Sequence, residues 1–303
     1  MVVSLFYRPE YVGANHDFDT TRKAKWVADS LYSEPIAGLH LVSPPSLSHD
    51  QLIRTHDPSY VRAVETGTPR GLAESQGFRW DAMLWTTVLA SNGGAVAAGL
   101  AALQSGVAGS LSSGLHHARW ERGAGFCTFN GLAIAAREAL LAGAGSVLIL
   151  DLDAHCGGGT ASLIAQEPHL WQVDVSVSDL DRYACAPRAR LSIVGSSDQY
   201  LGEIERALED VRCSGPRFGL CLYNAGMDPF EGCDIGGLRG ITRQTLEARE
   251  RLVFDWCRDA QLPVAFVLAG GYVGPRLDQE DLIGLHRLTL SAAAAAGNVA
   301  PAR

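Results

Sequence analysis

The chain has 303 residues, of which 47% are hydrophobic and 19% are charged, a composition that is ordinary for a globular protein and argues against disorder. Its formal net charge of -8 disfavours nucleic acid as a direct partner, because attraction to phosphate backbones needs a clustered basic surface. This length could hold two average domains, but α/β domains often use as many residues, and we expect one domain over residues 1–303.

Seven cysteines, none of them in a C-x-x-C pair, argue against a disulfide framework and against a structural zinc ribbon. We therefore expect a reducing, cytoplasmic location. The amino-terminal MVVSLFYRPEY has only a short apolar run, broken by Arg8, and does not resemble a signal peptide. We expect no segment with the unbroken apolar length of a membrane span, and hence no membrane partner.

The first third of the chain contains two stretches with Pro and Gly, residues 34–48 and 66–77, which we interpret as surface loops. Between them, RTHDPSY indicates the start of a helix with Asp57 and Pro58 at its cap positions, and we assign no role to His56. A helical pattern follows at residues 88–103.

The rest of the chain alternates between strand and helix patterns. Apolar runs that end in Gly, Asp or Asn indicate buried parallel strands in SVLILDLDAH, FGLCLYNAGMD and PVAFVLAGGY. Helical patterns cover residues 131–141, 245–259 and 281–296, and we interpret the alanine run at 292–296 as a fraying helix end. This alternation predicts a doubly wound α/β fold, with a mostly parallel sheet flanked by helices.

Adjacent histidines, His116 and His117 in GLHHA, precede a glycine-rich loop. Such a pair suits the activation of water, because one imidazole can act as a base while the other shapes the local charge. Neighbouring side chains of an extended strand point apart, so we expect a bend there. On the residues alone, the alternative of two ordinary loop histidines stays open.

Ionisable residues end two of the predicted strands. Asp151, Asp153 and His155 alternate along LDLDAH, so that Asp153 and His155 can face one metal ion, and Asp228 in NAGMD offers a third ligand. Two carboxylates, one imidazole and an open position are typical of a catalytic zinc site. Cys156 should project to the opposite side, and we do not count it as a ligand. Each Asp, taken alone, could instead cap the turn after its strand.

Two glycines precede Tyr272 in LAGGYVG. Glycines allow a tight turn and a close approach of the backbone, and the phenol could then reach an oxyanion. Taken alone the pattern is weak, because Tyr272, like Phe126 upstream, is more often a core aromatic.

In their order, these motifs closely resemble those of the histone deacetylase family, which includes acetylpolyamine amidohydrolases and acetoin-utilisation proteins. The resemblance runs from THDPSYVRAV through GLHHA, GFCTFNGLAIAA, LDLDAH and NAGMD to AGGY, and covers most of the chain. It implies an arginase/deacetylase-like fold and a zinc-dependent amidohydrolase. The implied substrate is an acylated amine, with acetyl as the expected acyl group, such as acyl-lysine on a protein, an acetylated polyamine or another small amine.

The same resemblance implies roles for individual residues. The implied zinc ligands are Asp153, His155 and Asp228. Tyr272 looks like the tyrosine that polarises the substrate carbonyl, and Gly125 and Phe126 look like part of the tunnel that surrounds the acylated side chain.

Further roles implied by the resemblance concern the histidine pair and a second cation. His117 looks like the general base and later acid, and His116 like its tandem partner. Asp151 looks like the residue that hydrogen-bonds His116. Together with Asp153 and Ser176, Asp151 also looks like a ligand of a structural potassium or sodium ion.

The chain departs from the family pattern after the D-x-H step. Family members commonly have a second His there and then an acidic or amide residue, whereas this chain has Cys156, Gly157 and Gly158. If Gly158 replaces the residue that supports the second tandem histidine, His117 lacks a carboxylate partner and its imidazolium is less stabilised. The wall segment at 176–200 and the rim segment LAESQGFRWD also differ from the usual form, so we expect a remodelled tunnel.

Two other functions compete with the deacylase reading. A ureohydrolase of the arginase type shares the fold and a D-x-H motif, but its binuclear manganese site needs more carboxylates than MDPF supplies. A catalytically silent module that binds acylated ligands is favoured only by the missing partner of His117. Substrate identity, acyl-chain length and oligomeric state stay open.

Overall fold

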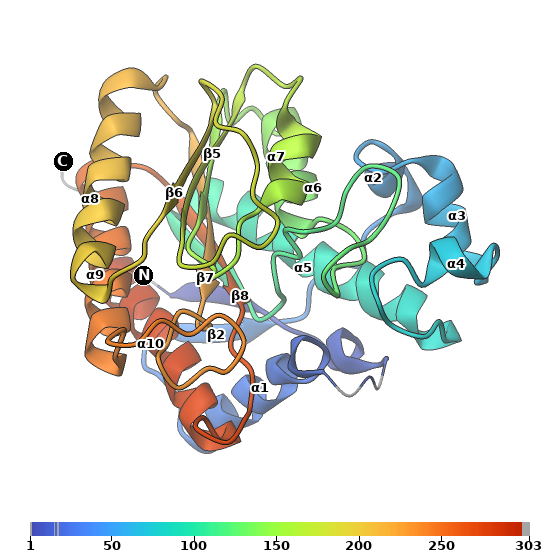
Figure 1. Ribbon diagram of the computed structural model, residues 1–303, viewed down its shortest axis with the longest axis horizontal. Coiled ribbons are helices and arrows are strands. Elements are labelled where there is room, and N and C mark those ends of the chain that lie inside the picture. The colour runs from blue at the N-terminus through green and yellow to red at the C-terminus, as the bar shows by residue number, and fades with distance from the viewer. Residues whose placement is uncertain (1, 15, 17, 299–303) are drawn as a thin grey trace.

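The computed structural model describes residues 2–14, 16 and 18–298, and its centre is an eight-stranded sheet in which all neighbouring strands are parallel. The strand order is β2-β1-β3-β8-β7-β4-β5-β6 (Figure 1). The strands are β1 (Val3–Phe6), β2 (Leu39–Val42), β3 (Val107–Ser110), β4 (Val147–Asp151), β5 (Leu170–Ser176), β6 (Ala189–Ile193), β7 (Leu220–Gly226) and β8 (Val264–Ala269). The predicted α/β fold is confirmed, with a sheet that is wholly parallel.

Helices cover both faces of the sheet and bury a separate apolar cluster on each (Figure 1). One cluster takes its helical side chains mainly from α1 (Lys23–Ser33), α8 (Ser197–Ser214), α9 (Arg243–Asp259) and α10 (Gln279–Asn298). The other takes them from α3 (Pro58–Thr66), α5 (Ala82–Ser105), α6 (Gly131–Leu141) and α7 (Gly158–Ile164). The short elements are α2 (His49–Ile53), α4 (Arg70–Ala73), η1 (Pro9–Val12) and η2 (Asp19–Thr21).

Helix α5 is the one helix of the described chain that is long and apolar enough to cross a membrane by length and composition. The expectation that no segment has these properties is therefore wrong for residues 82–105. Of its most apolar stretch, 61% is buried inside the protein, where α5 packs against β3, β8 and α6. A helix that is apolar on most sides is also what the core of a large α/β protein requires.

The strong helix patterns are confirmed, with α6 at its predicted bounds and α5, α9 and α10 longer than expected. The cap at the start of α3 is also confirmed, because Asp57 accepts hydrogen bonds from the backbone N–H of Ser59 and Tyr60. Three interpretations are wrong. Residues 34–48 contain β2, residues 66–77 contain α4, and the alanine run lies inside α10, where Ala293 and Ala294 are buried.

Short length explains the two missed elements. Strand β2 is a four-residue edge strand with no fully buried position, and α4 is a single turn, so neither has a hydrophobic period that a sequence can display. Because all eight strands are parallel, their carboxyl ends meet along one edge of the sheet, where the loops of an α/β fold form its binding crevice.

Candidate active site

The predicted site residues follow four strands that are neighbours in the centre of the sheet. In spatial order the strands are β3, β8, β7 and β4. The histidine pair follows β3, Tyr272 follows β8, Asp228 follows β7, and Asp153 and His155 follow β4. The topology therefore brings residues that are far apart in the sequence to one edge of the sheet.

Asp153, His155 and Asp228 form a buried group in which one ligand atom of each lies within 4.8 Å of the others. His155 Nδ1 is 3.1 Å from Asp153 Oδ1 and 3.1 Å from Asp228 Oδ2. Asp228 Oδ2 is buried and accepts no hydrogen bond from the described residues. Because a buried carboxylate oxygen is costly without a cation or a donor, the group fits a metal ion, and the structure brings the three predicted ligands together.

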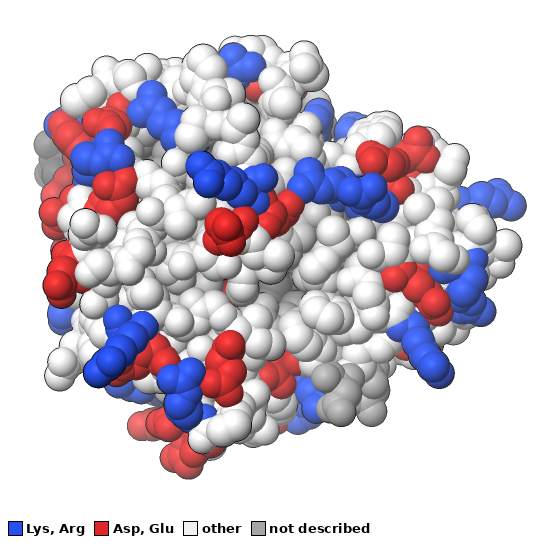
Figure 2. Space-filling view, viewed as in Figure 1, with Lys and Arg blue, Asp and Glu red and all other residues white. Residues whose placement is uncertain are grey.

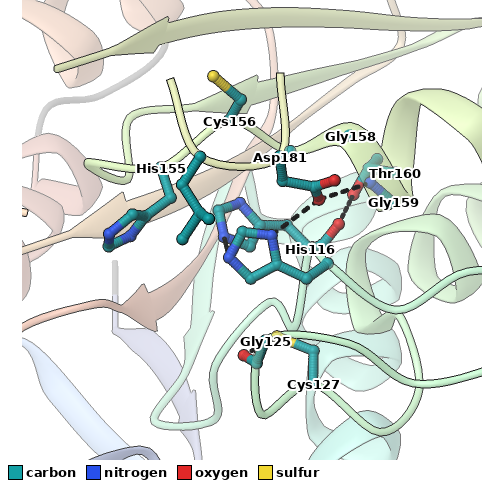
Figure 3. A network of polar contacts seen from close by, with 12 residues as sticks. His116, Gly125, Cys127, His155, Cys156, Gly158, Gly159, Thr160 and Asp181 are labelled. Atoms are coloured by element: carbon teal, nitrogen blue, oxygen red, sulfur yellow. Dashed lines mark hydrogen bonds and ion pairs between the residues drawn. The ribbon is translucent and has the colours of Figure 1, made fainter. Parts of the chain in front are cut away.

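The neighbouring Cys156 is not part of this group. Its thiol donates to the carbonyl oxygen of Ser178 at 3.3 Å, and Figure 3 shows the sulfur directed away from the ring of His155. The prediction that Cys156 is not a ligand agrees with this geometry.

Gly270 lies directly against the metal ligand Asp228. Its φ is +48°, and a Cβ at this position would lie 2.0 Å from Asp228 Oδ1. The carbonyl oxygen of Gly270 accepts a hydrogen bond of 2.5 Å from the buried ammonium group of Lys23, which reaches it from α1. Burial lowers the pKa of Lys23 to about 8, although Asp228 and Asp153 favour its charged form. No motif around Lys23 could have marked it as a neighbour of the site.

Tyr272 follows two glycines in the left-handed region and packs against Phe18, with ring centroids 5.0 Å apart. Burial and the nearby charges of Asp228 and Asp153 raise the pKa of the Tyr272 phenol well above its usual value. The hydroxyl therefore remains a hydrogen-bond donor at neutral pH, beside the metal ligands.

The expected bend at the histidine pair is present, because Leu115 adopts a φ of +57°. His116 Nδ1 donates to Asp151 Oδ2 at 2.8 Å. The Nε2 atoms of His116 and His117 converge and lie 3.1 Å apart. Both imidazoles therefore turn the same ring atom toward a common point.

His117 has a carboxylate partner, and the expectation that it lacks one is wrong. His117 Nδ1 donates to Asp181 Oδ2 at 2.8 Å, and Asp181 lies in the loop between β5 and β6 (Figure 3). Gly158 has no side chain to support His117, and the support comes instead from the segment that carries Asp181, against which Gly158 packs. The sequence carried no signal for this, because nothing in SDLDRY distinguishes Asp181 from Asp179.

The two histidines differ in their preferred charge. Burial disfavours the charged form of His116, but Asp151 and Asp153 outweigh it and raise the pKa of His116 to about 10. Burial and the charge of His116 lower the pKa of His117 below its usual value, although Asp181 acts in the opposite direction. Of the pair, His117 is therefore the imidazole that is neutral and basic near pH 7.

Asp151 lies at the end of β4 and is buried. Its Oδ1 accepts hydrogen bonds from Asn224 Nδ2 at 2.7 Å and from the backbone N–H of Asp153 at 3.3 Å. Ser176 is buried at the end of the adjacent strand β5. The structural potassium or sodium site at Asp151, Asp153 and Ser176 stays a prediction.

Two further polar residues hold the histidine loop in place. Asn130, the N-cap of α6, donates from Nδ2 to the carbonyl oxygens of His116 and Ala118, each at 3.2 Å. His56 donates from Nδ1 to the carbonyl oxygen of Arg119 at 2.8 Å, and its Nε2 accepts from the N–H of Asn130 at 3.0 Å. Because both ring nitrogens of His56 are used in this framework, it has none left for a metal.

Aromatic side chains gather beside Tyr272. Phe126 is 39% exposed, and its ring lies 4.2 Å from that of Phe18 and 5.2 Å from that of Phe78. Gly125 is pressed against the ring of His117, which puts the predicted tunnel residues Gly125 and Phe126 next to the histidine pair. In Figure 2 the face shown is hollowed near its centre, where the surface is mostly uncharged.

A buried arginine supports the strand ends from behind. Arg249 of α9 is fully buried and donates from Nη1 to the carbonyl oxygens of Gly226 at 2.7 Å and Leu152 at 3.3 Å. Its Nε and Nη2 donate to Glu250 Oε1 at 2.9 and 2.6 Å. Leu152 directly precedes the ligand Asp153, so Arg249 holds the backbone that carries the metal site.

The comparison with protein families gives one match, in which residues 16–183 fit the histone deacetylase domain. This range covers more than half of the 303 residues. The chain belongs to the histone deacetylase family. The matched range contains the histidine pair, the D-x-H ligands and Asp181, and the predicted family resemblance is thereby confirmed.

Relatives of this histone deacetylase family chain extend over most of its length. An uncharacterized protein of Picosynechococcus is 35% identical over 250 residues, covering 78% of this chain and 79% of its own. Histone deacetylase 2 of Arabidopsis thaliana is 27% identical over 296 residues, covering 89% of this chain and 75% of its own.

Solved structures show the same fold. The HDA15 HD domain superposes with a TM-score of 0.80 at 16% identity, over 99% of this chain and 92% of its own. The acetylpolyamine aminohydrolase of Burkholderia pseudomallei superposes with a TM-score of 0.77 at 20% identity, over 97% of this chain and 99% of its own. The deacetylase-like architecture therefore includes the strand ends after β7 and β8, beyond the range of the family match.

Proposed function

We propose that this protein is a zinc-dependent amidohydrolase that removes an acyl group, in the first instance acetyl, from an amine. The observation that carries the proposal is the arrangement of two imidazoles, each bound through Nδ1 to a carboxylate, beside a buried Asp-His-Asp metal site. Membership of the histone deacetylase family supports it.

Asp153, His155 and Asp228 would hold the zinc ion. Two carboxylates and one imidazole leave a coordination position open, which is the donor set of a catalytic site. Zinc bound there would lower the pKa of a water molecule and polarise the amide carbonyl.

The protein's own groups then move the protons and hold the developing charge. His117 accepts the proton of the attacking water at Nε2 and later donates it to the leaving amine. Throughout, the Nδ1–H of His117 remains hydrogen-bonded to Asp181. His116, paired with Asp151, keeps a positive charge beside it. The Tyr272 hydroxyl donates a hydrogen bond to the oxyanion.

The two competing functions lose support. The silent binding module was favoured only by the missing carboxylate at His117, and Asp181 supplies that carboxylate. A ureohydrolase needs ligands for two metal ions, whereas in the described part of the chain the group of Asp153, His155 and Asp228 is the one cluster of three or more candidate ligands.

The aromatic rings beside the site suggest the shape of the substrate. The ring of Phe18 packs against those of Phe126 and Tyr272, with centroids 4.2 and 5.0 Å apart, and the three rings form an apolar cluster. Such an apolar surface suits an alkyl stem that carries an acylated amine, as in acyl-lysine or an acylated polyamine. We propose neither nucleic acid nor membrane as a partner, and we propose a cytoplasmic location, which is supported by seven free cysteine thiols.

The test measures deacylation of an acetyl-lysine peptide, acetylputrescine and longer acyl-lysines by purified protein. Each assay is run on the protein as prepared, after chelation of metal, and after zinc is restored. We expect turnover of at least one substrate, its loss on chelation and its return with zinc. Absence of turnover from zinc-loaded protein with the whole panel would contradict the proposal, and absence of bound metal would overturn the ligand assignment.

A further inference from the structure

We propose that Asp181 is the positioning residue of His117 and that the loop between β5 and β6 is thereby part of the catalytic apparatus. The inference rests on the proposed function, in which His117 is the base. It is carried by the 2.8 Å hydrogen bond from His117 Nδ1 to Asp181 Oδ2 and by the surroundings of the carboxylate (Figure 3).

The first step concerns space. A Cβ at Gly158 would lie 2.3 Å from the carbonyl oxygen of Asp181 and 2.7 Å from its Oδ1. A side-chain carbon does not approach a non-bonded oxygen this closely, so Asp181 can occupy its observed place only because residue 158 has no side chain. The glycine at the expected support position and the carboxylate from the later loop are therefore one arrangement.

The second step concerns how the carboxylate is held. Gly159 donates its backbone N–H to Asp181 Oδ2 at 3.2 Å, and Arg119 donates from Nη2 to Oδ1. Arg119 also donates from Nη1 to the carbonyl oxygen of Gly158 at 3.2 Å. Asp181 adopts a φ of +61°, a left-handed conformation that Asp tolerates better than most residues. Charge-assisted bonds from two sides thus fix the carboxylate in one orientation.

The third step concerns the chemistry. A carboxylate at Nδ1 keeps the proton on that atom, so Nε2 of the neutral ring carries the basic lone pair. When Nε2 takes a proton, the resulting imidazolium is stabilised by the adjacent negative charge, and the proton stays on the imidazole until it passes to the leaving amine. Asp181 gains no proton in either step, so it acts through His117 and contacts no reacting atom.

The decisive variants are Asp181→Asn and Asp181→Ala, with Asp179→Ala as the matched control. Asp179 lies in the same loop and is exposed, and none of the hydrogen bonds or ion pairs described involves its side chain. On the proposal, Asp181→Ala lowers kcat by about 10–100-fold with little change in KM, because removal of a group behind a functional histidine has effects of this size. Asp181→Asn keeps an acceptor but loses the charge and should lie between Ala and the parent.

Bound zinc and thermal unfolding are measured on each variant, so that a loss of kcat is read only from protein that is folded and loaded. Asp179→Ala should match the parent in both kinetic constants. An Asp181→Ala variant that retains the parent kcat would overturn the proposal, and so would an equal loss in Asp179→Ala.

A readout independent of turnover separates this inference from the proposed function. Nitrogen NMR of the His117 imidazole in zinc-loaded protein should show the proton on Nδ1 in the parent and in Asp179→Ala, and a changed tautomer population in Asp181→Ala. If no substrate is turned over but the spectra differ in this way, the proposed function fails and the positioning role stands. Identical spectra in parent and Asp181→Ala would overturn the positioning role whatever the activity.

Gly158→Ala tests the spatial step from the other side. The added methyl group should displace the loop and lower kcat although Asp181 is intact, whereas Gly71→Ala, at a helical glycine with open space around its Cβ position, should not. Full activity of Gly158→Ala would overturn the claim that residue 158 must be glycine for Asp181 to reach His117.

Discussion

Arg249 Nη1 lies 2.7 Å from the carbonyl oxygen of Gly226, which ties helix α9 to the end of β7, two residues before the metal ligand Asp228. The arginine and its partner Glu250 are both buried. Replacement of Arg249 by methionine should leave the buried carboxyl group of Glu250 without its cation and two carbonyl oxygens without their arginine donor. We expect Arg249→Met to lower the free energy of unfolding by about 3–5 kcal/mol, measured by denaturant titration.

Arg251→Met is the matched control for Arg249→Met. Arg251 lies on the same helix and pairs with Glu247 at the surface, where the side chains are 63% and 47% exposed. Exposed pairs of this spacing contribute about 0.3–0.5 kcal/mol. A loss of stability in Arg249→Met no larger than that of Arg251→Met would show that the buried bonds do not hold α9 to the sheet.

Gly270→Ala should weaken metal binding. Its methyl group would lie 2.0 Å from Asp228 Oδ1, so the ligand or the loop must move. Gly145→Ala carries a comparable backbone strain, with φ of +69°, but its methyl group meets no atom within 4 Å. Zinc titration should show a higher Kd for Gly270→Ala than for the parent protein and Gly145→Ala. Equal affinity in both variants would contradict the predicted clash.

Tyr272→Phe should slow turnover while the zinc content stays unchanged. The substitution removes the hydrogen-bond donor proposed for the oxyanion, and the loss of one such donor lowers kcat by about 10²–10³-fold. Tyr32→Phe, at a tyrosine that is 71% exposed, should have no effect. If Tyr272→Phe kept the parent kcat, the phenol would have no part in holding the oxyanion.

On the acid side of its pH profile, kcat/KM should fall at a pH below the usual pKa of histidine. A base works in its neutral form, and burial together with the charge of His116 lowers the pKa of His117. As the pH falls from neutrality, His117 stays neutral past about pH 6.5, the usual histidine pKa, and kcat/KM should decline only below that point. A decline that begins above it would mean that the pKa of the base is raised.

The central strands and long helices could be predicted because burial leaves a period in the sequence. β4, β7 and β8 are apolar at nearly every position, as strands covered on both faces must be. β2 and α4 are too short to show a period. In α5, apolar residues on most sides identify a core helix only once β3, β8 and α6 are known to surround it.

In the site, the metal ligands could be predicted because Asp153 and His155 are close in sequence and lie at a strand end. Asp181, Lys23 and Arg249 could not, because their roles depend on contacts with residues distant in the chain. A carboxylate in a loop and a lysine in a helix are ordinary residues until the fold places a histidine or a glycine carbonyl beside them.

The steric exclusion between a side chain at position 158 and Asp181 also restricts which substitutions can accumulate at these two positions during evolution. If a side chain is gained at position 158 while Asp181 is present, its Cβ lies 2.3 Å from the carbonyl oxygen of Asp181. If Asp181 is lost while residue 158 is glycine, His117 loses its carboxylate partner. If Asp181 positions His117, either single change lowers activity. In homologous chains, an acidic residue at one of these positions should therefore accompany its absence at the other.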